Sequence, residues 1–300
     1  MGALGDSPAR DVTTREINLL LRKIAATGVS PRTVNKARQL IHAVFNYGMR
    51  PHTWSLTENP AKWADRRREP EPGPLPYYSV EQIEALARAF KSGAHRDPRA
   101  QGVGEEELAA RAEEDAQDAE LVRVAAYSGL RQGELVALRW RDVQFLGRKL
   151  VVSRTLSADV ESNSTKSGRF REVPLPDQAA GALDRLSRRD RYIGPDEYVF
   201  CNRFGRRLDP SALRRRYDRA RDAAGLPQLR FHDLRHTYGS LLVAGGVDLI
   251  SVKSAMGHSQ IGTTERYLHA RPATELADRF TDALNRPGGT RHAADVPTLA

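Results

Sequence analysis

One short run near the end of the chain holds residue types that could carry out phosphoryl chemistry. In GHSQIGTTERYLH, from Gly257 to His269, Tyr267 follows His258 by nine positions. Upstream, His232 and Arg235 stand three positions apart in a predicted helix, so their side chains should share one face. A phenol, two imidazoles and a guanidinium are therefore candidates for one site.

Two further cations belong to this candidate set. Arg131 comes just after a predicted helix break at Gly129, where the start of a new helix would add a positive dipole end to its charge. Lys166 lies in a polar stretch predicted to form a turn between two strands. Gly257 is expected to end a helix in the left-handed conformation, which places the imidazole of His258 at a helix terminus.

These side chains together predict attack on a phosphodiester. Two arginine forks could hold both non-bridging oxygens and neutralise the charge that develops in the transition state. A phenol has an ordinary pKa of about 10, but a nearby base and two cations can activate it as a nucleophile. Tyr267 would then form a phosphotyrosine, and Lys166 could protonate the leaving oxygen. The bond energy is kept in that intermediate, so no ATP, cofactor or metal ion is expected.

The charge balance favours a polyanionic partner. The 300 residues carry a formal charge of +9, and clustered cations release counterions when they bind nucleic acid. An anionic membrane surface would also fit the charge alone. Only seven of the 47 basic residues are Lys, and this excess of Arg suits bidentate phosphate contacts or reflects genomic base composition. The arginine runs 66–68 and 214–216 could contact a DNA backbone or form solvated faces.

Other functional classes are disfavoured. A single cysteine, Cys201, excludes an internal disulfide and a cysteine-based zinc site. The run HDLRH resembles the helix of a zinc protease, but Asp233 stands where a Glu would be needed and Arg235 would point a cation at the metal. His236 is therefore expected to be a structural or supporting residue. The chain has no apolar run long enough to span a membrane and no leader, so a cytoplasmic protein without membrane contact is expected.

The elements that must position these residues divide the chain into two predicted domains. Residues 1–65 are predicted to form a small helical domain with helices over 14–26 and 31–48. The second helix has Ser30 as its cap and Gly48 at its end. Its buried stripe is predicted to consist of Val34, Ile41, Val44 and Phe45. Residues 66–78 contain four prolines and predict an extended linker.

Residues 79–286 are predicted to form a larger domain, followed by a flexible tail over 287–300. Ser79 and Gln82 form a capping box for a helix that buries Ile83, Leu86 and Phe90. A polar acidic segment is expected to be a loop plus a surface helix, ahead of a separate helix from Leu121. Two β-rich runs, KLVVSRT and REVPLP, predict a small sheet. Later helices are expected at PSALRRRYDRARDAA, FHDLRHTYGSLLVAGG, DLISVKSAMG, TTERYLHA and PATELADRFTDAL.

The sequence resembles the tyrosine recombinases, or phage-type integrases. Three boxes in the right order carry the resemblance: SGLRQGEL (Ser128–Leu135), HDLRHTYGS (His232–Ser240) and MGHSQIGTTERY (Met256–Tyr267). The resemblance implies a mainly α fold with a small antiparallel β-sheet (α+β), in which a helical core-binding domain precedes the catalytic domain. It further implies site-specific DNA cleavage and rejoining through a 3′-phosphotyrosine.

The resemblance also assigns roles by position. The residues matching Arg131 and Arg235 bind the scissile phosphate, and Glu134 matches a supporting acid beside the first arginine. The remaining matches are Lys166 as general acid, His232 as base, His258 as phosphate donor and Tyr267 as nucleophile. The implied partners are double-stranded DNA attachment sites, a homotetramer on synapsed DNA and an accessory directionality factor. The helix PATELADRFTDAL, with Leu276, Phe280 and Leu284, would be exchanged between neighbours.

Two departures from the family pattern stand out. A further helix that usually begins the core-binding domain is missing, as is an arm-binding domain, so the first domain is expected to be incomplete. An acidic insertion over 105–118 is longer than the family's usual loop. Two other functions stay open: a DNA-binding remnant without strand exchange, which a suicide substrate that traps covalent protein would exclude, and a type IB topoisomerase, which site-independent relaxation of supercoils by a monomer would favour.

Overall fold

The chain forms two compact units, residues 1–73 and residues 74–300, and each is described by itself. The structure is a computed structural model that describes residues 7–71, 73–96, 104–157, 160–162 and 170–271. The predictions for Lys166, for the helix after Tyr267 and for the tail fall outside these residues. The boundary between the units lies within the stretch predicted as a linker.

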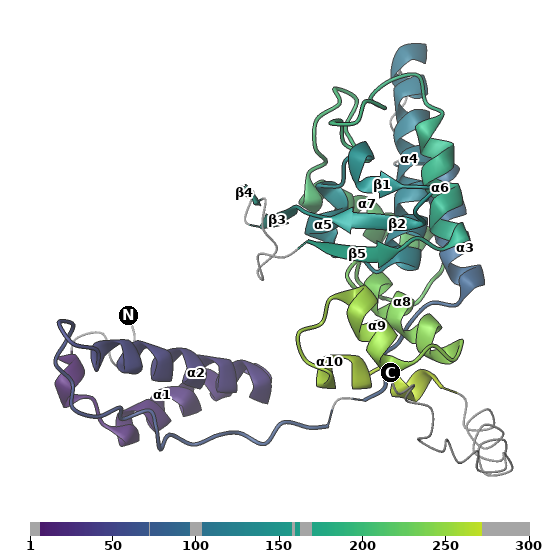
Figure 1. Ribbon diagram of the computed structural model, residues 1–300. Helices are drawn as coiled ribbons and strands as arrows, with labels where there is room; N and C mark the ends of the chain where they lie inside the picture. The colour runs from purple at the N-terminus through teal and green to yellow at the C-terminus, as the bar shows by residue number, and fades with distance from the viewer. Residues whose placement is uncertain (1–6, 72, 97–103, 158–159, 163–169, 272–300) are drawn as a thin grey trace, which may run out of the picture. The chain divides into compact units, whose positions relative to one another are not determined.

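The described part of the first unit contains a 3-10 turn followed by two helices, α1 and α2, which lie side by side in Figure 1. The turn η1 covers Ala9–Asp11, α1 covers Thr14–Ala26 and α2 covers Pro31–Gly48, so both predicted helices are confirmed. The hydroxyl of Ser30 accepts a hydrogen bond from the backbone N–H of Thr33, which confirms the predicted cap.

The buried stripe predicted for α2 is only partly right. Val34 and Phe45 are buried and Ile41 packs against the same cluster, whereas Val44 is 42% exposed. Successive residues of a helix are rotated by about 100°, so Val44 leaves the interface that its neighbour Phe45 enters. The helix ends at Gly48, as predicted, and its cap is Met49 in a right-handed conformation.

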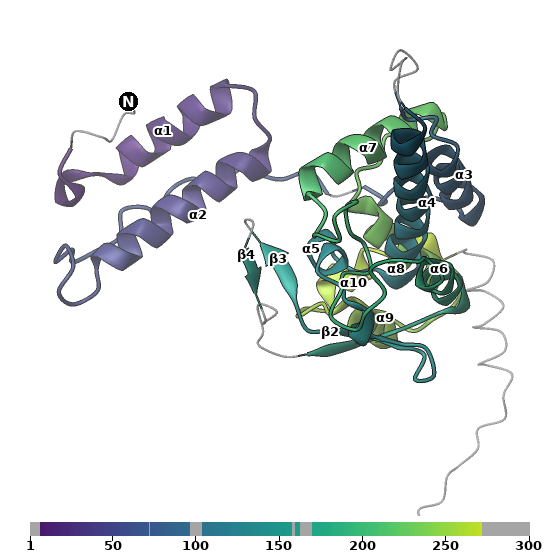
Figure 2. The same cartoon turned by 90° about the horizontal axis from the view of Figure 1, so that it is seen from above.

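The second unit is mainly helical around a small antiparallel sheet, which confirms the predicted fold class. Figures 1 and 2 show its helices and sheet from two directions. The elements up to the sheet are α3 (Val80–Lys91), α4 (Glu105–Ser128), α5 (Gln132–Val136), η2 (Trp140–Asp142), β1 (Val143–Gln144), β2 (Lys149–Val152), β3 (Thr155–Ser157), β4 (Val160–Ser162) and β5 (Arg171–Pro174). The later elements are α6 (Asp177–Ser187), α7 (Pro210–Ala223), α8 (Asp233–Ala244), α9 (Leu249–Met256), α10 (Gly262–Glu265) and η3 (Leu268–Ala270).

The sheet pairs the two runs that the alternation of residues predicted. Its strand order is β1-β2-β5 with antiparallel neighbours, and Leu150 faces Val173 while Val152 faces Arg171. Leu150, Val152 and Val173 are buried, because alternate residues of a strand point to the same face. A separate two-stranded sheet pairs β3 with β4. The sheet therefore presents Arg171 at the start of β5 toward the side of the core.

The acidic segment differs from its prediction. Residues 105–128 form one continuous helix, α4, instead of a surface helix followed by a separate one. Asp118 is completely buried and Asp115 is 5% exposed. Their carboxylates pair with Arg216 of α7 and with Arg96 respectively. The negative charges that suggested a solvated surface are thus neutralised inside the unit, which lets the helix run on into the core.

The capping box of α3 and its buried face are confirmed. Ser79 and Gln82 form the box, and Ile83, Leu86 and Phe90 are buried. Tyr78, the last residue of the stretch predicted as a linker, is also buried, and its hydroxyl donates a 2.8 Å hydrogen bond to the Pro227 carbonyl. Part of the predicted linker therefore belongs to the core of the second unit.

The last elements carry the site. Figure 1 shows α8, α9 and α10 gathered beside the β5 edge of the sheet. The predicted helices at α7, α8 and α9 are confirmed, whereas α6 was not predicted. The helix predicted over TTERYLHA is split into α10 and η3, with Tyr267 between them, because Thr264 and Tyr267 are both turned into the interior. No helix in the described part of the chain has the length and apolar character needed to cross a membrane.

The Asp118–Arg216 pair provides a stability test. Removing one partner of a buried pair leaves an uncompensated charge, so Asp118→Ala should lower the free energy of unfolding of the second unit by about 3–5 kcal/mol. The matched control is Asp184→Ala, whose carboxylate pairs with Arg188 at 2.6 Å with side chains 49% and 74% exposed. That loss should stay below about 1 kcal/mol. Equal losses in urea unfolding would contradict a structural role for the acidic segment.

Candidate active site

Arg235 is the centre of the candidate site. It lies in α8, is 3% exposed, and donates hydrogen bonds to the carbonyls of Gly129 and Met256. These carbonyls lie at the C-terminal ends of α4 and α9, where the helix dipoles are negative. Burial first, then the charges of Arg131 and Arg171, lower the pKa of Arg235 to about 10. Among the described residues it makes no ion pair, so a buried positive charge is left without a counter-anion.

Arg131 approaches the same place from another element. It caps the N-terminus of α5 with a 44% exposed side chain. Its Nη1 donates to the Glu134 Oε1 at 2.9 Å, and its Nη2 donates to the Gly257 carbonyl at 3.3 Å. Arg131 and Arg235 therefore both contact the backbone of the turn that precedes His258. Three segments that are far apart in the sequence meet here, as the candidate set requires.

Arg171 is a member of this group that the sequence analysis missed. Its Nη1 and Nη2 donate to the two oxygens of Glu134 at 2.5 Å and 2.8 Å. The sequence did contain a signal for Arg171. This arginine shares a strand face with the buried Val173, and an arginine on a buried face needs an internal anion. Two guanidinium groups of the described site thus bond one carboxylate, and the charges of both act on the third, that of Arg235.

Glu134 is the internal anion of the site. It is 3% exposed, and burial alone would raise its pKa. The hydrogen bonds and charge of Arg171, followed by those of Arg131, instead bring the pKa of Glu134 down to about 2. The carboxylate is therefore ionised at neutral pH and holds both arginines.

His258 follows a left-handed turn, as predicted. Gly257 has a φ of 62°, and a Cβ at this position would lie 2.8 Å from the Arg171 Cδ. The His258 Nδ1 is 3.0 Å from the hydroxyl of the buried Thr264. Burial, followed by the charges of Arg235 and Arg131, lowers the pKa of His258 to about 4. The ring is therefore neutral and fixed at Nδ1, with Nε2 remaining to contact a ligand.

Tyr267 is buried beside two imidazoles. It is 1% exposed, and its ring stacks on that of His258 with centroids 6.3 Å apart. Gly239 of α8 permits this packing, because a Cβ there would lie 2.8 Å from the tyrosine ring. Burial raises the pKa of Tyr267, and the charges of Arg235 and Arg266 oppose that change. The phenol therefore needs a specific base to lose its proton.

His236 is the residue that contacts this phenol. Its Nδ1 lies 2.9 Å from the Tyr267 hydroxyl. Burial first and then the neighbouring His232 lower the pKa of His236 to about 4, so the ring is neutral and its nitrogen can accept the proton. The sequence analysis gave His236 only a structural or supporting place. The repeated histidine of HDLRH was the available signal for a second imidazole.

His232 lies at the edge of this group. It precedes α8, is solvent-exposed, and its ring centroid is 5.2 Å from that of His236. Desolvation of its ring and the charge of Arg235 lower its pKa. In the described structure, the His232 ring contacts that of His236, the second histidine of HDLRH. The described residues contain no cluster of His, Cys, Asp or Glu suited to a metal ion.

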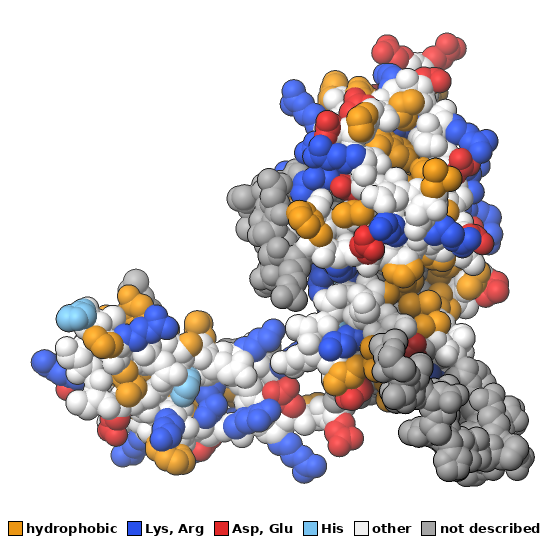
Figure 3. Space-filling view, viewed as in Figure 1, with side chains coloured by type: hydrophobic (Ala, Val, Ile, Leu, Met, Phe, Trp, Pro, Cys, Tyr) orange, Lys and Arg blue, Asp and Glu red, His pale blue; other side chains and the backbone are white. Residues whose placement is uncertain are grey.

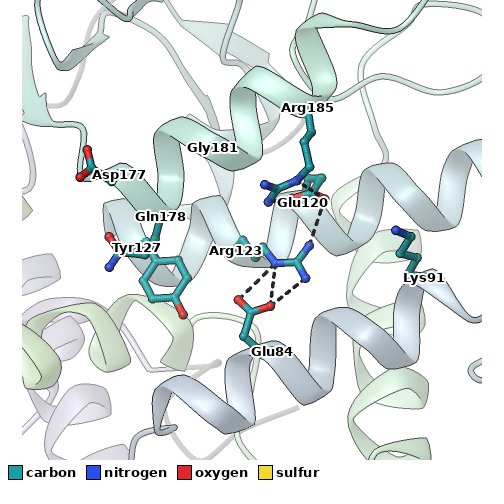
Figure 4. Close-up of a pocket in the computed structure, with 9 residues that line it drawn as sticks. All are labelled: Glu84, Lys91, Glu120, Arg123, Tyr127, Asp177, Gln178, Gly181 and Arg185. Atoms are coloured by element: carbon teal, nitrogen blue, oxygen red, sulfur yellow. Dashed lines mark hydrogen bonds and ion pairs between the residues drawn. The ribbon is translucent and has the colours of Figure 1, made fainter.

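A separate cavity of about 360 Å³ lies between α3, α4 and α6. Figure 4 shows that four of its charged side chains pair with one another: Arg123 binds Glu84 and Glu120, and Arg185 binds Glu120. None of the predicted site residues lines it. The convergence around Arg235 therefore remains the candidate active site.

Comparison with known proteins identifies relatives for both the sequence and the fold. The phage integrase family model matches residues 105–274. A tyrosine recombinase XerC-like protein of Caldanaerobacter subterraneus subsp. tengcongensis is 27% identical over 290 residues, covering 86% of this chain and 67% of the relative. A putative prophage phiRv2 integrase of Mycobacterium tuberculosis is 34% identical over 156 residues, covering 50% of this chain and 41% of the relative. The match therefore spans less than half the length of the second relative.

Solved structures show the same fold. The Tn1549 transposon integrase in complex with circular intermediate DNA has a TM-score of 0.67 at 19% identity, covering 95% of this chain and 89% of that one. A λ integrase dimer bound to a COC′ core site has a TM-score of 0.63 at 18% identity, covering 90% and 84%. XerH bound to a palindromic difH substrate has a TM-score of 0.64 at 19% identity, covering 91% and 73%.

The neutral histidines can be tested by their titration. Because the pKa values of His236 and His258 are lowered to about 4, both rings should bind a proton only as the pH falls below about 5. NMR of the ring nitrogens should show neutral imidazoles from about pH 5.5 to about pH 8, with His236→Gln and His258→Gln used for assignment. In Tyr267→Phe, only the His236 Nδ1 signal should lose its hydrogen-bond shift. Titration of either ring near its ordinary pKa would contradict the assigned environment.

Proposed function

The chain belongs to the phage integrase family, and from that premise we propose that it is a site-specific DNA recombinase that cleaves and rejoins DNA through Tyr267. The observation that carries the proposal is the uncompensated charge of Arg235. Glu134 forms ion pairs with Arg131 and Arg171, and Arg235 donates to backbone carbonyls instead. A phosphodiester brings one negative charge and two non-bridging oxygens, which suit the open positions of the arginines.

The proposed cleavage step is a transesterification. The Tyr267 oxygen attacks the phosphorus, forming a Tyr–O–P bond while the P–O bond to the 5′ oxygen breaks. The phenol proton passes to a neutral imidazole, and the Nδ1 of His236 at 2.9 Å is positioned to accept it. The product is a 3′-phosphotyrosine and a free 5′-hydroxyl. Attack by a 5′-hydroxyl reverses the step, so rejoining needs neither ATP nor a metal ion.

The other residues are proposed to stabilise the transition state. Arg131 and Arg235 bind the non-bridging oxygens, and Glu134 orients Arg131. If the hydroxyl of Thr264 donates to the Nδ1 of His258, which lies 3.0 Å away, the opposite Nε2–H is free to donate to a phosphate oxygen. Lys166 remains the proposed general acid for the leaving oxygen, and His232 remains a proposed base at the mouth of the site.

The basic surface is proposed to follow the DNA backbone. Figure 3 shows Lys and Arg side chains dispersed over the visible face of the second unit. In the arginine run of α7, Arg214 and Arg215 are exposed, whereas Arg216 is held by Asp118. The run predicted to contact DNA therefore offers its first two members for that purpose, because the third is a structural ion pair.

The proposed partners are double-stranded attachment sites and further copies of the chain. The λ integrase relative is described as a dimer on a core site, and XerH as a post-cleavage complex on a palindromic site. We propose a homotetramer that holds two duplexes, with an accessory directionality factor as a further partner. The predicted exchange helix with Leu276, Phe280 and Leu284 lies outside the described residues.

The proposed nucleophile is tested by a covalent trap. A suicide substrate that loses the 5′-hydroxyl fragment should accumulate a protein–DNA adduct, detected by denaturing gel, and Tyr267→Phe should abolish the adduct because the attacking oxygen is gone. The matched control is Tyr238→Phe, which changes another tyrosine of the same buried cluster. That variant should retain most of the adduct.

Two results would count against the proposal. Adduct formation by Tyr267→Phe would show that another residue attacks the phosphorus. Wild-type protein that binds attachment-site DNA without forming any adduct would indicate a DNA-binding remnant. Peptide mapping of the adduct to residues 266–271 identifies the attachment point directly.

A further inference from the structure

Arg171 occupies a place in the site that no predicted role explains. Its guanidinium donates to both oxygens of Glu134 at 2.5 Å and 2.8 Å. Arg131 reaches the same two oxygens, with its side chain at 2.9 Å from Oε1 and its backbone N–H at 2.8 Å from Oε2. Each carboxylate oxygen therefore accepts one hydrogen bond from each arginine. Glu134 is shared between an arginine that is 14% exposed and one that is 44% exposed.

This sharing determines what Arg131 can do. A buried carboxylate needs charge and hydrogen bonds to stay ionised. With Arg171 supplying a bidentate pair, Glu134 does not depend on Arg131 alone. The exposed guanidinium of Arg131 can then turn a donor outward to a phosphate while its other contacts are retained. Without Arg171, the carboxylate would either take up a proton or draw Arg131 fully to itself.

Arg171 also supports the turn that carries His258. Its side chain passes so close to Gly257 that a Cβ there would lie 2.8 Å from its Cδ and 3.0 Å from its Nε. The Nε–H is buried and has no hydrogen-bond partner among the described residues, which is unfavourable for a buried donor. Arg131 contacts the Gly257 carbonyl from the same neighbourhood. Arg171 thus bonds the carboxylate that holds Arg131 and lies against the glycine that precedes His258.

We propose that Arg171 is a positioning residue for strand cleavage: it holds Glu134 and the Gly257–His258 turn in place, so that Arg131 is free to bind the scissile phosphate. This inference rests on the proposed function. Arg171 acts through Glu134 and through the turn, and it does not contact the reacting atoms. Its effect should therefore appear in the rate of cleavage more than in DNA affinity.

The first test compares Arg171→Gln with wild type in the suicide-substrate assay at saturating DNA. Misplacing catalytic groups by about 1 Å reduces rates by about 100-fold, and we expect a loss of this size with little change in binding. The loss should become smaller as the pH rises, because Glu134 without its main counter-charge ionises only at higher pH. In the Glu134→Gln background, this pH dependence should disappear.

The control and the conservative variant separate this role from a general loss of structure. Arg154→Gln removes another buried pair, with Asp142, whose side chains are 11% and 9% exposed, and its pH dependence should match that of wild type. Arg171→Lys keeps the charge and should recover part of the rate. If Arg171→Gln does not fold, Arg171→Lys is measured in the Glu134→Gln background, where it should add little further loss. A wild-type rate, an unchanged pH profile or fully additive losses would overturn the proposal.

A measurement without catalysis distinguishes failure of this inference from failure of the proposed function. The folded-state pKa of Glu134 is lowered to about 2 from 4.5, so its stabilising contribution is present above the unfolded value and is lost as the pH falls through the folded value. In Arg171→Gln the folded pKa should rise, which removes that contribution at neutral pH. The difference in unfolding free energy between wild type and Arg171→Gln should therefore grow as the pH rises from about 2, the folded-state pKa of Glu134 in wild type, to the raised pKa of Glu134 in the variant. A constant difference would overturn the proposal even if no adduct forms.

Discussion

The rest of the site depends on one buried cation that has no carboxylate of its own. Arg235 is held by the carbonyls of Gly129 and Met256, and these are the ends of two helices whose dipoles are negative at that point. Such carbonyls can orient a guanidinium without neutralising it. The positive charge therefore remains available, and its pKa falls to about 10, because of burial and then because Arg131 and Arg171 are close.

This constraint explains the form of the surrounding turns. The chain must present two carbonyls to one guanidinium, and it does so by ending α4 and α9 at Gly129 and Gly257, both with a φ of 62°. Each turn is followed closely by a residue of the candidate site: Arg131 comes two residues after Gly129, and His258 comes directly after Gly257. The same hydrogen bonds that satisfy Arg235 thus place the other two groups beside it.

The site also shows how an unbalanced charge is tolerated in a folded protein. Elsewhere in the same unit, buried charges are paired, as Asp118 is with Arg216 and Glu120 is with Arg185. Around Arg235 the charge balance is incomplete, because Glu134 pairs with Arg131 and Arg171 and Arg235 has no carboxylate partner among the described residues. The unpaired charge lowers the stability of this part of the protein. Its hydrogen-bond donors are already held in position for an anion, so they need little rearrangement when a ligand binds.

Local sequence was sufficient for most of the helices and for the sheet, and it proposed one set of site residues. Capping at Ser30 and Ser79, the glycine breaks and the alternation in KLVV and REVP are short-range signals, since they depend on backbone conformation and residue spacing. The order of the three boxes identified Arg131, His232, Arg235, His258 and Tyr267 as one candidate set. Only the tertiary structure showed that Arg171 shares Glu134, that His236 meets the phenol, and that Arg216 and Asp118 are paired inside. Charged residues in a sequence suggest an exposed surface. Whether an oppositely charged residue neutralises them inside the protein depends on how segments that are far apart in the sequence pack together.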